Sequence, residues 1–103
     1  MIVRVFRVTV NDGKQADFEQ FFRQTAAPHV RSQPGLISLQ MGRPLPSTPD
    51  EFVMVMLWKN LDAVKSFAGT GWQQAVILEQ ERDLIREVSV HHYEAMDEGI
   101  CSS

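Results

Sequence analysis

The run from Glu51 to Trp58, E-F-V-M-V-M-L-W, constrains the fold most, because it is apolar on both faces of a β-strand. Successive strand side chains point to opposite faces of a sheet, so such a strand needs cover on both sides. A chain of 103 residues forms a single domain with a thin core. We therefore expect one sheet face to pack on the chain's own helices and the other on an identical subunit.

The order of the remaining patterns predicts a ferredoxin-like α+β fold. Apolar and β-branched residues dominate four strand-like segments, which are 2–10, 36–43, 51–58 and 87–95. We expect Ile37, Leu39 and Met41 to share one face of the second of these strands. Helical patterns follow the first and third, so the order is β-α-β-β-α-β, an antiparallel sheet with both helices on one face. The domain is expected to span residues 1–95, with 96–103 as a loose tail.

The first helical pattern runs from Lys14 to Gln33, and its apolar residues recur on one stripe. Asp12 is a plausible N-cap for this helix. Pro28 lacks a backbone N–H, so we expect it to kink the regular helix or end it near Ala27.

The second helical region is broken into pieces. Asn60 or Asp62 can cap a short helix, which Gly69–Gly71 should end. Residues Trp72–Ile77 predict a restarted helical turn. Residues Glu79–Arg86 predict a third helical piece, charged and solvated, in which we expect no chemistry.

Composition excludes several classes of function. The net charge is −3 and no run of Lys and Arg occurs, so a nucleic-acid partner is not expected. No apolar stretch approaches the roughly 18 residues of a transmembrane helix, so a membrane role is not expected either. One cysteine, Cys101, excludes a disulfide within the chain and argues against a cysteine metal site. We expect a cytoplasmic protein without a signal peptide.

The surplus of apolar residues also favours a homodimer. Hydrophobic residues make up 44% of the chain and include six Phe and two Trp. This is more apolar material than one thin core needs, and a partner subunit is the simplest place to bury it.

The segment M-V-M-L-W-K-N-L-D-A-V-K-S-F, residues 54–67, resembles the strand-to-helix signature of antibiotic biosynthesis monooxygenase domains. Its marks are Trp58 at the strand end, then Ala63 and Phe67 on the helix. Pro34-Gly35-Leu36 is similar to the family's entry into its second strand, and Tyr93 to its last strand. The resemblance covers about residues 1–95 and implies a dimeric α+β barrel. Some members of the family oxidise phenolic polyketides without a cofactor, others degrade haem, and many have no known activity.

The haem-degrading members use an Asn on the first strand, a Trp ending the third and a His on the following helix. Trp58 matches the Trp, but Phe6 stands at the Asn position and Val76 near the His position. The axial iron ligand is therefore missing. We expect neither haem nor any other cofactor. A metal site built from His29, His91 and His92 has no support from their spacing.

The cofactor-free members need an apolar pocket, a base and a proton donor, because a deprotonated phenol can itself reduce oxygen. Trp58 matches their cavity Trp, whereas Asn60, Tyr93 and Arg4 are residues of the right type in suitable elements. This resemblance implies Arg4 as a stabiliser of negative charge and Trp58 as a pocket wall.

The base is expected to be a histidine of the cavity, and two are candidates. His29 falls on the apolar stripe of the first helix. His91 and His92 point to opposite faces of the last strand, and His92 shares its parity with Val88 and Val90, which favours it as the buried one. The expected substrate-contacting residues are Phe6, Phe22, Met56, Phe67, Trp72 and Tyr93.

Each of these residues also has a purely structural interpretation. Trp58 and the methionines can be core residues, and the histidines can be held by hydrogen bonds. Arg4 can form a structural ion pair, with Glu51, Glu87 or Glu94 as the carboxylate. Two hypotheses therefore stay open, a cofactor-independent oxygenase of a small aromatic or quinol-like substrate, and a homodimer that binds a small molecule or is structural. The first requires a proton acceptor inside the cavity.

Overall fold

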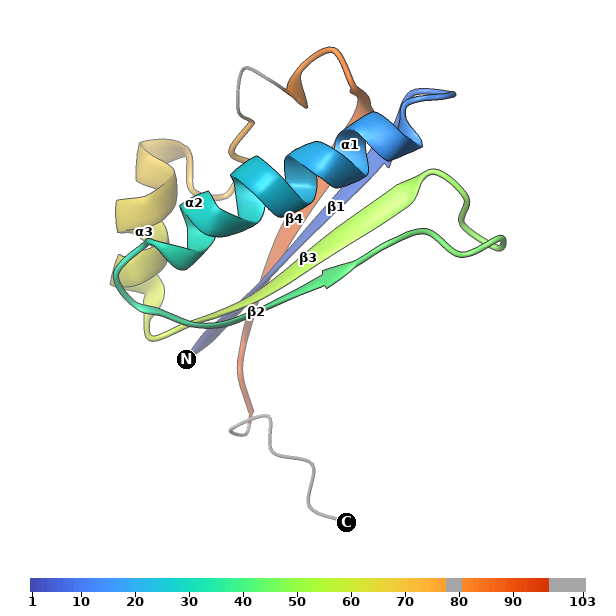
Figure 1. Ribbon diagram of the computed structural model, residues 1–103. Coiled ribbons are helices and arrows are strands. Elements are labelled where there is room, and N and C mark those ends of the chain that lie inside the picture. The colour runs from blue at the N-terminus through green and yellow to red at the C-terminus, as the bar shows by residue number, and fades with distance from the viewer. Residues whose placement is uncertain (78–80, 97–103) are drawn as a thin grey trace.

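The computed structural model describes residues 1–77 and 81–96 and confirms the predicted ferredoxin-like α+β fold. Its four antiparallel strands lie in the order β2-β3-β1-β4. All labelled helices cover the same face of the sheet, as Figure 1 shows. Cys101 lies outside the described residues. The elements are β1 (Ile2–Val10), α1 (Gln15–Phe21), the π-helical turn η1 (Phe22–Ala26), α2 (Ala27–Arg31), β2 (Leu36–Gly42), β3 (Glu51–Trp58), α3 (Leu61–Ala68), the 3-10 turn η2 (Gly69–Gly71) and β4 (Ile85–Glu94).

The two central strands, β1 and β3, have the bounds that their patterns predict. β1 pairs with β3 on one side and with β4 on the other. Arg4 lies opposite Met56 and opposite His92, so these three side chains share the face that the helices cover. This register places a cation and an imidazole in an otherwise apolar layer.

β2 corrects one prediction about side-chain direction. Leu36 pairs with Trp58 and Ser38 pairs with Leu57, so Ile37 is an extra residue at a bulge. The side chain of Ile37 is 52% exposed, in contrast to the expected alignment with Leu39 on the core face. The bulge changes the alternation that the prediction assumed.

Pro28 was expected to kink the regular helix or end it near Ala27. The helical segment does not end there but continues to Arg31, and its regular α-helix is interrupted just before Ala27. The turn before it, η1, is π-helical, and the N–H of Ala27 bonds to the carbonyl of Phe22. A π-turn is a common way for a helix to absorb a residue that does not fit the α-helical ladder. Pro28 then falls in the first turn of α2, where its missing N–H costs little.

Helix starts and ends were predicted with mixed success. Asp12 is not the N-cap of α1, because α1 begins at Gln15 and Lys14 occupies the cap position without a side-chain bond. Asn60 does cap α3, and its Oδ1 accepts a hydrogen bond from the N–H of Ala63 at 2.9 Å. Gly69 ends α3 with a φ of 78°.

The helical turn predicted for Trp72–Ile77 is wrong, because residues 72–77 form a turn followed by irregular chain. Of the piece predicted for Glu79–Arg86, Glu81 is 3-10 helical and residues 82–84 are a turn. β4 then begins at Ile85, two residues before the predicted start. Residues 78–80 lie outside the described part of the chain. An irregular segment therefore passes along the helix side of β4, where Arg4 receives its contacts.

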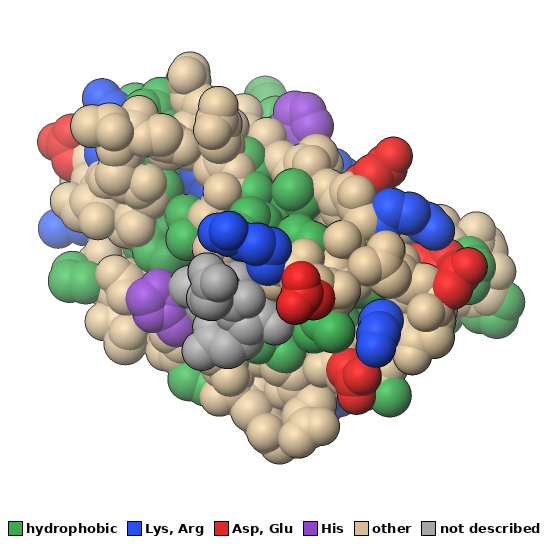
Figure 2. All heavy atoms as spheres, turned by 90° about the horizontal axis from the view of Figure 1, so that it is seen from above, with side chains coloured by type: hydrophobic (Ala, Val, Ile, Leu, Met, Phe, Trp, Pro, Cys, Tyr) green, Lys and Arg blue, Asp and Glu red, His purple; other side chains and the backbone are tan. Residues whose placement is uncertain are grey.

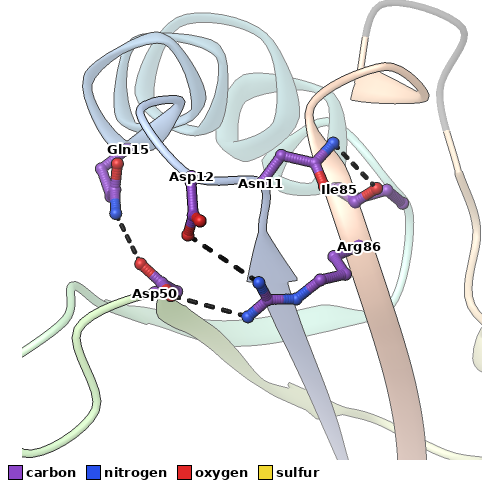
Figure 3. A network of polar contacts seen from close by, with 6 residues as sticks. All are labelled: Asn11, Asp12, Gln15, Asp50, Ile85 and Arg86. Carbon is purple, nitrogen blue, oxygen red and sulfur yellow. Dashed lines mark hydrogen bonds and ion pairs between the residues drawn. The ribbon is translucent and has the colours of Figure 1, made fainter.

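A polar network ties the ends of three strands to the start of α1, as Figure 3 shows. Arg86 of β4 lies 3.9 Å from a carboxylate oxygen of Asp12 and 3.5 Å from one of Asp50. Gln15 donates to the other carboxylate oxygen of Asp50 at 2.5 Å. Exposed ion pairs of this kind contribute at most about 1 kcal/mol each. The network fixes the position of α1 more than it stabilises the fold.

The core lies between the helices and the sheet and is rich in phenylalanine. Phe18 is fully buried and its ring packs against Phe21, Phe22 and Phe52 with centroids 4.9–5.9 Å apart. The opposite side of the sheet has no covering element among the described residues. This surface, called the outer face below, includes the apolar residues Val3, Val5, Val53, Val55, Leu57 and Tyr93, and polar residues such as Arg7 and His91 lie beside them.

Candidate functional site

A small cavity lies between the helices and the two central strands. Its volume is about 40 Å³. That is room for a few water molecules and not for an aromatic ring. The wall is mostly apolar but includes three ionisable side chains, those of Arg4, His29 and Glu81. It is formed by Arg4, Phe6, Phe22, Ala26, His29, Val30, Met54, Met56, Phe67, Val76 and Glu81.

Arg4 is the central polar group of this cavity and is only 1% exposed. Its Nη1 donates to the carbonyl of Trp72 at 2.7 Å, and its Nη2 donates to the carbonyl of Gln74 at 3.1 Å. The guanidinium also lies over the ring of Phe67, 5.6 Å from the centroid. Burial lowers the pKa of Arg4 to about 10, so it remains a cation at neutral pH.

Two features of Arg4 suit it for binding an anion. Its Nε is buried and has no hydrogen-bond partner in the described part of the chain. Its side-chain hydrogen bonds go to two backbone carbonyls and to His92, so the predicted ion pair with Glu51, Glu87 or Glu94 is wrong. A buried cation held by these neutral groups favours an anionic ligand beside it.

His92 holds the other side of Arg4. Arginine can only donate, so the 2.8 Å contact between Arg4 Nη1 and His92 Nε2 makes that nitrogen the acceptor. His92 is therefore neutral, with its proton on Nδ1, and Trp72 packs edge-on against its ring at 5.0 Å. Burial lowers the pKa of His92, and the charges of Arg4 and His91 lower it further.

The lowered pKa of His92 predicts a loss of stability in acid. The unfolded chain binds a proton at His92 near the ordinary pKa of 6.5, whereas the folded chain binds it only at lower pH. The contribution of His92 is thus fully present above pH 6.5 and is lost as the pH falls through the folded pKa. We expect wild-type protein to lose more stability than His92→Gln between pH 7 and pH 5, measured by urea unfolding.

His91→Gln is the matched control for this measurement, because His91 is exposed and pairs with Val5 on the other face. It should retain most of the pH dependence of the wild type. Equal pH slopes for wild type and His92→Gln would contradict the assignment of a neutral, half-buried His92.

The aromatic wall is built around Phe67. Trp58 is fully buried and stacks on Phe67 with centroids 5.0 Å apart. The ring of His29 lies 6.0 Å from Phe67 on another side. The indole Nε1 of Trp58 is buried and has no partner in the described residues. A buried N–H without an acceptor is costly, which makes it a second donor available to a ligand.

The sequence-predicted site residues are brought together only in part. Arg4, His29, Phe6, Phe22, Met56 and Phe67 all line the cavity. Trp58, Trp72 and His92 stand directly behind that wall through their contacts with Phe67 and Arg4. Tyr93 is 53% exposed and pairs with Val3 on the outer face, away from the cavity. Asn60 is occupied in capping α3.

Glu81 is the cavity residue that sequence reasoning missed. It was assigned to a solvated helix, but it is 3% exposed and lines the cavity with Arg4 and His29. Its neighbours Arg82 and Asp83 are exposed, so the local sequence looks entirely polar. Its burial depends on the path of the segment before β4 relative to the helices. The local sequence pattern does not predict that path.

The donor set does not fit haem. Val76, which stands near the position of the haem-degrading members' histidine, lines the cavity with an apolar side chain that cannot bind iron. Within residues 1–77 and 81–96, no three His, Cys, Asp or Glu side chains come close enough to hold a metal ion.

No helix among residues 1–77 and 81–96 is long and apolar enough to cross a membrane. On the helix side, acidic and basic side chains are interspersed, as Figure 2 shows.

Comparison with known proteins places these features in a family. The sequence profile described as antibiotic biosynthesis monooxygenase matches residues 1–77. No curated protein sequence is significantly similar to the chain. Among solved structures, SnoaB from Streptomyces nogalater, a cofactor-independent oxygenase, is 27% identical with a TM-score of 0.68, and the match covers 93% of each chain.

Two further structures share the fold at lower identity. A Deinococcus radiodurans protein assigned to the antibiotic biosynthesis monooxygenases is 20% identical over the whole of both chains, with a TM-score of 0.78. MhuD, solved with manganese protoporphyrin IX bound, is 19% identical over 95% of this chain and 97% of its own, with a TM-score of 0.73. The similar structures thus include a cofactor-independent oxygenase and a porphyrin-binding protein.

Proposed function

The chain belongs to the antibiotic biosynthesis monooxygenase family, and on that basis we propose that it is a cofactor-independent monooxygenase of a small aromatic or quinol-like substrate. The observation that carries this proposal is the buried Arg4, whose unpaired Nε accompanies an apolar, aromatic cavity wall. An apolar cavity with one fixed cation favours a flat aromatic anion over its neutral form.

The proposed reaction needs little from the protein. The substrate loses a proton, and its anion transfers electrons to dioxygen, which is the oxidant. A carbon–oxygen bond forms to give a peroxide. The peroxide takes up the first proton. Its O–O bond and the remaining C–H bond of that carbon then break, the C=O double bond forms, and the distal oxygen leaves with both protons as water. Arg4 stabilises the substrate anion, and the apolar wall excludes bulk water from it.

The other residues receive supporting roles in this proposal. His92 orients Arg4 by accepting its hydrogen bond. Phe67 forms the wall on which the substrate ring stacks, and Trp58 supports Phe67 from behind. His29 is exposed on one side and lines the cavity on the other, so it exchanges protons between the cavity and solvent. Phe67 is half-buried, and the methionines of the wall are flexible, so a ring enters by displacing them.

The test is oxygen uptake by purified, metal-stripped protein with a panel of anthrones and dihydroquinones. We expect uptake above the rate without enzyme, and slower uptake by the double variant His29→Ala, His92→Ala. His91→Ala is the matched control, since His91 does not line the cavity. No uptake across the panel by a folded protein would favour the alternative, a non-catalytic homodimer that binds a small molecule or is structural.

We further propose that the protein is a cytoplasmic homodimer whose subunits meet through the outer face. Val55 on the central strand β3 is 37% exposed and Tyr93 on the edge strand β4 is 53% exposed in the single chain, and their cross-strand partners on β1 are Val5 and Val3. A contiguous apolar sheet face of this kind is typical of a subunit interface.

A charge at the centre of the outer face should separate the subunits. Val55→Asp places a carboxylate at a site that is accessible in the single chain, so the subunit should still fold, but burying the charge on association is costly. We expect light scattering to give a dimer mass for the wild type and a monomer mass for Val55→Asp. Ala16→Asp, at an exposed position of α1, is the control and should stay dimeric. A dimeric Val55→Asp variant would place the interface elsewhere.

A further inference from the structure

Glu81 is a buried carboxylate that the proposed reaction has not yet used. It precedes β4 in the chain, and only 3% of it is exposed. Its cavity partners come from β1, β3 and the helices, and they include Arg4 and His29. Carboxylates are almost never fully buried without a specific reason, and a cavity that also holds a cation is such a reason.

The position of Glu81 matches what proton abstraction requires. A general base must reach the proton of a substrate that lies in the cavity. Glu81 and Arg4 line the same small space, so a substrate bound beside Arg4 shares its cavity with a carboxylate. Arg4 has an unpaired donor for the oxygen that becomes negative. Glu81 makes an interaction of its own, but a carboxylate offers about four lone-pair sites, so it can also accept the proton that leaves.

The histidines are less suited to this step. The Nε2 of His92 accepts a hydrogen bond from Arg4, and His92 does not itself line the cavity. His29 is exposed on its other side, where water competes for its proton. Glu81 is the more enclosed acceptor of the two groups that line the cavity.

We propose that Glu81 is the catalytic base that removes the acidic proton of the aromatic substrate. The substrate's O–H or activated C–H bond breaks, an O–H bond forms on the Glu81 carboxylate, and the electron pair stays on the substrate beside Arg4. The proton then returns to the peroxide oxygen that leaves as water. This assignment rests on the proposed oxygenase function, and it adds the residue that starts the reaction.

The experiment separates deprotonation from oxidation. Anthrone is incubated with the protein in D₂O without oxygen, and deuterium incorporation into its acidic CH₂ group is measured by mass spectrometry or NMR. Oxygen uptake is measured in parallel in air. We expect Glu81→Gln to lower both rates by about 10²–10⁴-fold, which is the usual contribution of a general base. Glu81→Asp keeps a carboxylate and should retain part of both rates.

Asp17→Asn is the matched control, because it makes the same carboxylate-to-amide change at an exposed position of α1. It should leave both rates unchanged. Wild-type uptake of oxygen together with undiminished deuterium exchange in folded Glu81→Gln would overturn the role of Glu81 and leave the oxygenase function standing. Absence of both activities in the wild type across the anthrone and dihydroquinone panel would overturn both. If Glu81→Gln does not fold, a folded Glu81→Asp with wild-type exchange would overturn the assignment.

Discussion

Replacing Gly35 with alanine is expected to lower the free energy of unfolding by about 2–5 kcal/mol, the sum of a strained backbone and an overpacked contact. Gly35 has a φ of +88°, a conformation that side chains disfavour. A Cβ at this position would lie 2.5 Å from the Cβ of Ala63 in α3. The carbonyl of Gly35 also accepts from the N–H of Lys59 at 2.8 Å, so the backbone cannot move away without losing that bond. Urea unfolding monitored by circular dichroism measures the change.

Gly13→Ala separates the two causes of the Gly35 effect. Gly13 has a φ of +78° but no atom within 4 Å of the added Cβ, so it should lose only about 1–2 kcal/mol. The double variant Gly35→Ala, Ala63→Gly should be more stable than the sum of its single changes, because the clash is relieved. Similar losses for Gly13→Ala and Gly35→Ala would show that close packing against α3 is not the cause.

Replacing Arg4 with methionine is expected to lower kcat/KM for oxygen uptake by about 10²–10³-fold, the usual effect of removing one donor to a developing anion. Methionine fills part of the space of the arginine stem and removes the positive charge of the guanidinium from the cavity. The same change removes one of the causes that lower the pKa of His92, so that pKa should rise towards its ordinary value. An NMR titration of the His92 ring measures this shift independently of any substrate.

Arg4→Lys is the comparison for the methionine variant. It keeps a positive charge but lacks the planar fork that reaches the carbonyls of Trp72 and Gln74 together with His92. We expect intermediate activity and a smaller rise in the pKa of His92. Unchanged oxygen uptake by a folded Arg4→Met variant would remove Arg4 from the reaction, and an unchanged His92 titration would contradict its electrostatic contact.

The strands could be predicted from sequence because their signal is local. The bounds of β1 and β3 follow from runs of β-branched and apolar residues, and the structure has them at the predicted residues. The direction of the Ile37 side chain could not be predicted, because a one-residue bulge reverses the alternation of side chains between the two sheet faces. No glycine at this position indicates the bulge. The possibility that the helix ends at Pro28 was wrong for a similar reason, since the π-turn before this residue absorbs the disruption that proline usually causes.

The candidate site was predictable only where strand register decides it. Parity on β1 and β4 brings Arg4 and His92 to the same face, and the aromatic residues follow from helical spacing. Glu81 was missed because its burial is a long-range event, set by a segment that is irregular in the described residues and flanked by charged side chains. The partners of Arg4 were missed for the same reason, because two of them are backbone carbonyls that no residue type reveals.

The π-turn η1 carries one more residue than an α-helical turn would, and this has a consequence for how the family can vary. Deleting one residue from Phe22–Ala26 would convert the turn into regular helix and leave α2 close to its present orientation, because the π-turn already absorbs the additional residue. Val30 would stay in the core and His29 at the cavity. A deletion elsewhere in the helix would instead rotate the residues after it by about 100° around the helix axis. A single-residue gap in an alignment at η1 therefore marks a relative whose cavity keeps the same helix face.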